Sequence, residues 1–253
     1  MAYSTISKPS LHFNTKLYTG NGGSNRGITG VGFQPDWLWL KARSKANSHI
    51  LIDVVRGANR LRSDSNAAQA SVSGEFISFD TDGFTVTENA SNEMNNNSTT
   101  YAAWNWKAGG GQGSSNTDGS INTTYTSVNT TAGFSISSYT GTGSTDTVGH
   151  GLGVVPNVII IKQLNETRDW ISYHKDIGAE KYLQLNQDYA QGDNDNFMND
   201  PAPTNQVFTV KTFNEVNKSG ASYIAYCFAE KKGYSKFGSY TGNGNEDGTF
   251  VYT

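Results

Sequence analysis

One ten-residue stretch occurs twice in this chain and constrains the fold more than any other feature. Residues 32–41 read Gly-Phe-Gln-Pro-Asp-Trp-Leu-Trp-Leu-Lys, and residues 153–162 read Gly-Val-Val-Pro-Asn-Val-Ile-Ile-Ile-Lys. The two prolines, Pro35 and Pro156, are 121 positions apart. A proline followed by large apolar residues without a helical period predicts a β-strand that is covered on both faces.

Matches continue on both sides of this strand. The turn Tyr-Thr-Gly-Asn-Gly at 18–22 recurs as Tyr-Thr-Gly-Thr-Gly at 139–143. Residues 84–86 match 208–210 at an offset of 124, and residues 101–106 match 223–228 at an offset of 122. Because the offset stays within a few residues along the chain, the sequence indicates an internal duplication.

The duplication predicts four segments. Residues 1–112 are expected to form a first β-sandwich repeat, and residues 133–233 a second. Between them, residues 113–132 are rich in Gly, Ser, Thr and Asn and form either a linker or a peripheral strand. Residues 234–253 contain a third Tyr-Thr-Gly-Asn-Gly at 240–244, so they are either a terminal hairpin or the start of a third repeat.

The composition favours an all-β chain. The 28 glycines and the many Asn and Ser residues supply turns, while aromatic residues, at 12%, supply bulk for a core. About seven or eight short strands in about 100 residues are typical of a β-sandwich. We therefore expect two tandem antiparallel β-sandwich units, and the best helix candidate is no more than a turn or two at Asn66–Ser71.

Charge and cysteine content limit the classes of function. The net charge is −3 and no basic run occurs, so we expect the protein not to bind nucleic acid. Cys227 is the single cysteine and lies in an apolar run, so a buried, inert thiol is expected. We find no signal segment and no run of transmembrane length, so we expect no membrane insertion. If the protein works outside a cell, either another route such as lysis takes it there or the sequence is part of a longer protein.

The repeated motifs also support a resemblance to a known family. They comprise the turn at 18–22, the strand at 32–41, Ser48–Ala58, Asp82–Val86 and Tyr101–Gly110, and in the second half Tyr223–Glu230 and Tyr234–Gly244. Together they resemble uncharacterised repeat domains of tail-fibre-like and other virion structural proteins of marine bacteriophages. The resemblance implies a virion-surface, extracellular β-domain of concanavalin-like jelly-roll type. It supplies no catalytic or ligand-binding motif.

The tryptophans are the first candidates for a carbohydrate site, because sugar rings stack on exposed aromatic faces. Trp37 and Trp39 match Val158 and Ile160, and their strand is apolar on both faces, which favours core packing. Trp104 and Trp106 match other large residues and are also assigned to the core.

Trp170 differs from the other tryptophans because its counterpart in the first half is polar and charged residues precede it. We expect Trp170 to be the most exposed tryptophan. Together with Tyr173 and His174 on the same segment, it is the candidate ligand-binding site, with a half-buried structural role as the alternative.

The acidic residues suggest a metal site rather than a catalytic one. Asp193 and Asp195 lie in an oxygen-rich loop near Asp200 and are candidate ligands of a calcium ion, with a solvated loop as the alternative. No cofactor besides this Ca²⁺ is expected. The four histidines lack the spacing of a metal site, and no nucleophile elbow or phosphate-binding loop is present.

Three hypotheses for function follow. The first is a non-enzymatic virion component that recognises host-surface polysaccharide through loops at the sandwich ends. The second is a purely structural spacer or a capsid or tail decoration module, which contacts only other virion proteins. The third, for which no catalytic residue can be named, is a polysaccharide-degrading enzyme. A homotrimer is suggested only by analogy with tail fibres.

Overall fold

A computed structural model describes residues 4–88, 93–198 and 201–251. Antiparallel strands dominate it, with one 3₁₀ turn, η1 (Pro9–Leu11), and one short helix, α1 (Asn214–Asn217), among the described residues. The expected all-β class is confirmed. The helix candidate at Asn66–Ser71 is wrong, because its last two residues form a strand that pairs at a sheet edge.

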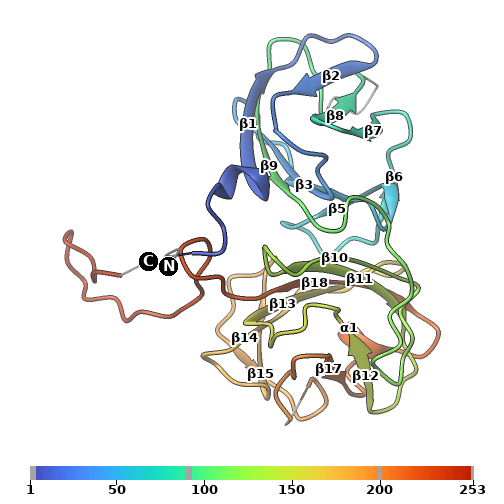
Figure 1. Cartoon of the computed structure of the whole chain (residues 1–253), viewed down its shortest axis with the longest axis vertical. Coiled ribbons are helices and arrows are strands. Elements are labelled where there is room, and N and C mark those ends of the chain that lie inside the picture. The colour runs from blue at the N-terminus through green and yellow to red at the C-terminus, as the bar shows by residue number, and fades with distance from the viewer. Residues whose placement is uncertain (1–3, 89–92, 199–200, 252–253) are drawn as a thin grey trace.

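The first half of the chain builds two sheets (Figure 1). The larger sheet has six strands in the order β1-β9-β3-β4-β5-β6, and the smaller one has three in the order β2-β8-β7. Their bounds are β1 Phe13–Thr19, β2 Arg26–Thr29, β3 Trp37–Ala42, β4 Ile50–Asp53, β5 Gly57–Arg62, β6 Ala70–Ser71, β7 Phe76–Asp80, β8 Gly83–Val86 and β9 Thr100–Trp106.

The second half repeats this plan. Its larger sheet has seven strands in the order β10-β11-β18-β13-β14-β15-β16, and the smaller one pairs β12 with β17. Their bounds are β10 Tyr125–Asn129, β11 Phe134–Thr140, β12 Asp146–Gly149, β13 Val158–Gln163, β14 Ile171–His174, β15 Lys181–Gln184, β16 Gly192–Asp193, β17 Val207–Val210 and β18 Ser222–Phe228.

The two large sheets share one strand order, from β1-β9-β3 in the first half to β11-β18-β13 in the second. The register is also shared, since Tyr18 lies opposite Tyr101 and Tyr139 lies opposite Tyr223. One difference is at the edge. Strand β11 is covered by β10, which lies inside residues 113–132, whereas β1 ends its sheet.

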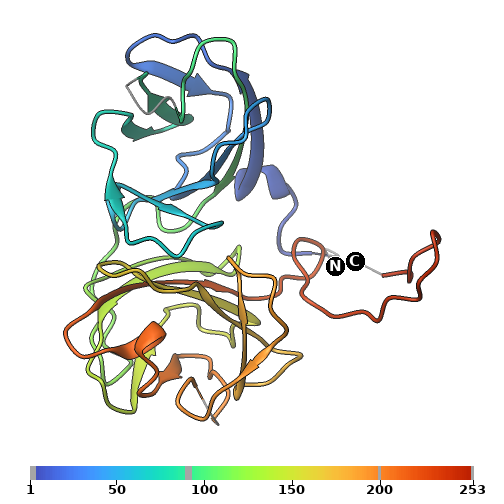
Figure 2. The same ribbon diagram turned by 180° about the vertical axis from the view of Figure 1, so that it is seen from behind.

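The sheets stack in four layers, with the two large sheets in the middle (Figures 1 and 2). One core fills the space between the large and small sheets of the first half, and a second core does the same in the second half. A third core lies between the two large sheets and includes Trp37, Leu51, Phe134, Trp170 and Tyr226. Each large sheet is therefore covered on both faces over much of its area.

The repeated strand is at the centre of this stack. In β3, Leu38 and Leu40 face the first core, whereas Trp37 packs between the large sheets. In β13, Ile159 and Ile161 face the second core. Side chains alternate along a strand, so a run without polar interruption is what a doubly covered strand needs. The prediction of a strand covered on both faces is confirmed.

The repeated turn owes its sequence to a close backbone approach. In the second half, the Tyr139 hydroxyl donates to the carbonyl of Val216 (2.7 Å), and the side-chain oxygen of Asn217 accepts from the backbone of Thr142 (2.8 Å). A Cβ on Gly141 would lie 2.4 Å from the carbonyl oxygen of Lys218. The first half has the same arrangement around Tyr18 and Gly20.

We expect Gly141→Ala to lower the free energy of unfolding by about 1–3 kcal/mol, because the added methyl group forces a backbone shift in a packed turn. Gly242 occupies the same position in the third copy of the motif, and nothing lies within 4 Å of a Cβ built there. Gly242→Ala is therefore the matched control. Urea denaturation of both variants measures the difference, and equal midpoints would contradict this account of the turn.

The third copy of the motif has a different environment. No strand is assigned to the described residues after Phe228, and Figure 1 shows this segment extending away from the sheets. Tyr240 is 70% exposed, whereas its counterparts Tyr18 and Tyr139 are buried. The base of the segment is nevertheless fixed to the body, because the backbone N–H of Phe237 donates to the Glu230 carboxylate (3.0 Å).

Candidate functional site

An aromatic cleft of about 400 Å³ opens at one side of the layer between the two large sheets. Aromatic side chains from both halves of the chain line it: Phe13, Trp37, Trp39, Trp106, Phe134 and Phe228. Tyr234 and Phe237, at the base of the terminal segment, also line it. The sequence places these rings here because β1, β3 and β9 direct alternate residues toward the second large sheet.

The aromatic cleft offers few hydrogen-bonding side chains. Tyr234 and Ser235 each bring a hydroxyl, and the Ser235 hydroxyl donates to the carbonyl of Ala229 (3.3 Å). The indole N–H of Trp37 is buried and has no acceptor. Burying a polar group without a partner is unfavourable, so this cleft suits an apolar group.

A second, polar cleft lies beside the first. Trp39, His49, Ser63 and Asp64 line it from the first half. The segment 185–188, which follows β15, lines it from the second half with Leu185, Asn186, Gln187 and Asp188. Trp39 lines both clefts, so it is their common wall.

The Trp39 ring is fixed by a hydrogen bond. Its Nε1–H donates to Nδ1 of His49 at 2.8 Å. Burial lowers the pKa of His49, which keeps the imidazole neutral at pH 7. Because Nδ1 accepts a hydrogen bond, the neutral ring carries its proton on Nε2. His49 is therefore a hydrogen-bond donor at the polar cleft, and the face of Trp39 rather than its N–H is left for a ligand.

The walls of the polar cleft are held by hydrogen bonds within each half of the chain. Asp64 accepts the backbone N–H of His49 (3.2 Å). Asn186 accepts the backbone N–H of Trp170 (2.8 Å) and donates to Asp169 (2.7 Å). These contacts fix the side chains that face the cleft before any ligand arrives, which reduces the entropy lost on binding.

Trp170, the first candidate for ligand binding, is buried rather than exposed. Its side chain has 0% exposure, so the expectation that it is the most exposed tryptophan is wrong. Its Nε1–H donates to the carbonyls of Arg62 (2.9 Å) and Ser65 (3.2 Å). Trp170 therefore supports the segment that carries Ser63 and Asp64 without lining the polar cleft itself.

The other candidates on that segment are also away from the clefts. Tyr173 is buried in the core of the second half. His174 is half-buried at the end of β14, where its Nδ1 accepts the backbone N–H of Asp176 (3.2 Å). The strand alternation places them on opposite faces of one sheet. Within residues 4–88, 93–198 and 201–251, neither residue lines the aromatic or the polar cleft.

The predicted calcium ligands lie in an exposed region. Asp193 ends β16, and Asp195 follows two residues later with its side chain exposed. Asp200 lies outside the described residues. Among the residues that the structure does describe, no group of three or more His, Cys, Asp or Glu side chains gathers closely enough to hold a metal ion. Calcium binding at this loop stays a prediction.

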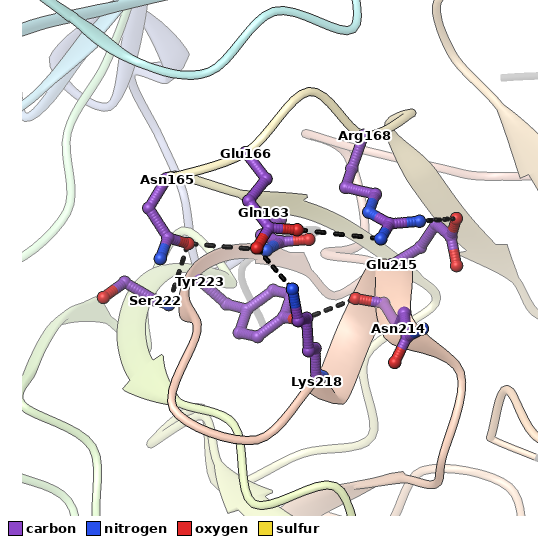
Figure 3. A network of polar contacts seen from close by, with 9 residues as sticks. All are labelled: Gln163, Asn165, Glu166, Arg168, Asn214, Glu215, Lys218, Ser222 and Tyr223. Carbon is purple, nitrogen blue, oxygen red and sulfur yellow. Dashed lines mark hydrogen bonds and ion pairs between the residues drawn. The ribbon is translucent and has the colours of Figure 1, made fainter.

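A network of charged side chains joins the segment after β13 to α1 (Figure 3). Glu166 pairs with Lys218 and with Arg168 (3.6 Å), and Arg168 also pairs with Glu215 (3.4 Å). The bond from Lys218 lowers the pKa of Glu166. These charges neutralise one another, and such half-exposed pairs contribute little to stability, so the network fixes local structure without forming a binding site.

Two buried groups that resemble reactive residues are structural. Asp36 accepts the backbone N–H groups of Ala108 (2.6 Å) and Gly110 (2.9 Å), although burial raises its pKa. Cys227 is buried as expected, and burial raises the pKa of its thiol to about 12. Neither residue lines a cleft in the described part of the chain.

Sequence reasoning missed the residues of both clefts. It assigned Trp39 and Trp106 to the core, yet both are only half-buried. The available signal was the asymmetry of the duplication, since the aromatic positions of β3 are aliphatic in β13. Aromatic rings kept in one copy alone are not required by the fold that the two copies share.

Comparisons with known proteins identify a family without an assigned activity. No curated protein and no solved structure matches the chain. No helix within the described residues is long and apolar enough to cross a membrane. A family model does match residues 8–253, which is nearly the whole chain. The chain therefore belongs to the family described as Domain of unknown function (DUF7483).

Proposed function

We propose that this protein is a non-enzymatic carbohydrate-binding module and that a sugar ring lies in the polar cleft against Trp39. The observation that carries the proposal is the fixed Trp39 face beside hydroxyl-binding side chains from both halves. A sugar ring has an apolar face, which suits an aromatic surface, and a rim of hydroxyl groups. That combination matches a cleft with one aromatic wall and a few placed polar groups.

The polar side chains divide into donors and acceptors. Nε2–H of neutral His49 is a donor, and the carboxylates of Asp64 and Asp188 are acceptors for hydroxyl protons. Hydrogen bonds in which one partner is charged are the stronger ones. Adjacent hydroxyls on one face of a sugar are the groups that such a set recognises, so the proposed ligand is an uncharged or cationic saccharide rather than an acidic one.

Binding without hydrolysis fits these acids better than catalysis. Glycoside hydrolysis needs two carboxyl groups that flank the bond, one of them kept protonated by an apolar environment. Asp64 and Asp188 are both exposed, so water solvates each carboxylate. The buried acid, Asp36, is occupied by backbone N–H groups.

The setting we propose is the surface of a virion, where the module binds host-cell polysaccharide. The resemblance of the repeated motifs to tail-fibre-like proteins supports this setting. The four stacked layers supply a rigid body on which loops between strands carry recognition.

A glycan array probed with the full chain tests the proposal. We expect binding to a defined group of neutral glycans and a loss of affinity of about tenfold in Trp39→Ala, because stacking on an aromatic ring contributes about 0.5–1.5 kcal/mol or more. Trp104→Ala is the matched control. Trp104 lies opposite Trp39 in the sheet and is half-buried, but it does not line either cleft.

Three outcomes would overturn the proposal. If the wild-type chain binds no glycan, the protein acts as a structural spacer or decoration module that contacts other virion proteins. If it releases reducing ends from host polysaccharide, it is an enzyme. Equal loss of binding in the Trp39 and Trp104 variants would place the sugar somewhere other than the polar cleft.

A further inference from the structure

We propose that the free edge of β1 binds the terminal arm, residues 238–251, of a second copy of this chain. The duplication supplies the first observation. In the second half, β10 covers the edge of β11, whereas no strand among the described residues covers the corresponding edge of β1. A free sheet edge is a place where another chain can add a strand.

The edge of β1 presents backbone groups without partners. The backbone N–H of Lys107 donates to the carbonyl of His12 (2.8 Å), so in this register the even-numbered residues of β1 bond to β9. The backbone groups of alternate residues point the other way in an antiparallel strand. Those of Leu17 therefore point to the free edge, where the described residues offer them no partner. The Leu17 side chain is also 57% exposed.

The residues that precede β1 leave this edge open, although β10, which precedes β11, covers the edge in the second half. Pro9–Leu11 form η1, which turns the chain away from the sheet. The hydroxyl of Ser4 then donates to the carbonyl of Lys232 (2.6 Å), which fixes these residues beside the base of the terminal segment. The first half therefore has an acceptor edge but no strand of its own to fill it.

The terminal arm has a sequence that suits this edge. In the second half, Tyr125 of β10 lies opposite Ser138, the counterpart of Leu17. A threonine follows Tyr125, and the terminal arm repeats this Tyr-Thr pair at 240–241, where the tyrosine is exposed. If the arm lies on β1 as β10 lies on β11, Tyr240 is opposite Leu17. Such a cross-strand pair buries apolar surface of both side chains.

The direction of the chain favours an arm from a second copy. Within one copy, Phe237 lines the aromatic cleft together with Phe13, the first residue of β1. An arm that continues from there along β1 runs parallel to it. All strand pairs in the two large sheets are antiparallel among the described residues. Figure 1 shows the arm extending away from β1. An arm from another copy can approach in the antiparallel direction.

The first test mixes two variants of the full chain, Leu17→Cys and Tyr240→Cys, under mild oxidation. Directly opposite residues of antiparallel strands have Cα atoms about 4.5–5.5 Å apart, a separation that a disulfide spans. Cys227 does not interfere because it is buried and its thiol has a pKa of about 12. We expect a disulfide-linked dimer that contains one copy of each variant.

Ile77→Cys in place of Leu17→Cys is the matched control. Ile77 is 44% exposed and lies on β7, which is also the edge strand of a sheet. A mixture of Ile77→Cys and Tyr240→Cys is expected to form little of the mixed dimer, because nothing in the duplication places a strand on β7.

The second test uses analytical ultracentrifugation and needs no added cysteine. Donor and acceptor are different surfaces of one chain, so copies associate head to tail and the mean mass of the wild type should rise with concentration. Leu17→Lys is expected to weaken association by about tenfold or more, because a charge replaces apolar surface at the edge. Ile77→Lys is the control and is expected to associate like the wild type. Equal melting temperatures check that both variants fold.

Three results would overturn the inference. A wild-type chain that sediments as a monomer at every concentration has no such contact. Equal cross-linking of Leu17→Cys and Ile77→Cys with Tyr240→Cys would show random encounters. If the double variant Leu17→Cys/Tyr240→Cys closes an internal disulfide as a monomer while the mixed single variants form no dimer, the arm binds β1 of its own copy.

Discussion

Replacing Trp170 with alanine is expected to lower the free energy of unfolding by about 3–5 kcal/mol, the range for truncating a buried aromatic side chain. The side chain has 0% exposure and packs between the two large sheets. Its removal leaves a cavity in that layer. It also removes the donor to the carbonyl of Ser65 and one of the donors to the carbonyl of Arg62, which still accepts the backbone N–H of Ser65 (3.4 Å). Guanidinium denaturation of the variant and the wild type measures the difference.

Trp170→Phe separates packing from hydrogen bonding. Phenylalanine retains much of the contact area but has no N–H, so we expect a smaller cost of about 1–3 kcal/mol from the hydrogen bonds that the two carbonyls lose. Because those carbonyls belong to the segment that carries Asp64, this variant should also weaken sugar binding while most of its stability remains. An unchanged unfolding midpoint in Trp170→Ala would show that the two large sheets do not pack as described.

The sequence predicted the strands well where a pattern within one strand decides the outcome. The uninterrupted apolar run of β3 and its repeat in β13 predicted strands covered on both faces. Short strands with polar or mixed composition were missed. Strand β15 (Lys181–Gln184), for example, pairs at the side of its sheet and buries little of its surface.

The error at Trp170 has a physical cause. Charged neighbours at 166–169 suggested a surface segment, and they do form a half-exposed network. The cover over Trp170 comes from Arg62 and Ser65, which are more than 100 positions away. A pattern of local polarity cannot show which face of one repeat is covered by the other repeat.

The clefts were beyond sequence reasoning for a related reason. Trp39 and His49 lie near each other in the chain, but Asp188 reaches the same cleft from the second half. The aromatic cleft likewise combines Phe13 with Phe228. Both halves of the chain contribute side chains to each cleft. The duplication shows which residues the two halves have in common, but it does not show how the halves pack against each other.

Replacing Asp53 with alanine is expected to lower the free energy of unfolding by about 3–5 kcal/mol, because the change leaves a buried charge without its partner. Asp53 and Arg56 form an ion pair at 2.7 Å, with side-chain exposures of 0% and 3%. Asp53 also accepts the hydroxyl of Tyr226 at 2.7 Å, which links the first large sheet to the second. Thermal and chemical denaturation of Asp53→Ala measure the loss.

A triple variant tests whether this loss comes from the unpaired charge or from the ion pair itself. Asp53→Leu, Arg56→Met and Tyr226→Phe together remove both charges and the hydroxyl while keeping similar volumes. Replacing a buried ion pair with apolar groups is often neutral or stabilising by about 1–4 kcal/mol. We therefore expect the triple variant to recover most of the stability lost in Asp53→Ala. If the triple variant does recover that stability, the buried cluster of Asp53, Arg56 and Tyr226 fixes the relative position of the two large sheets rather than the strength of their association. Its removal should then change the shape of the two clefts. A triple variant as unstable as Asp53→Ala would instead show that the ion pair and the Tyr226 hydrogen bond contribute net attraction between the sheets.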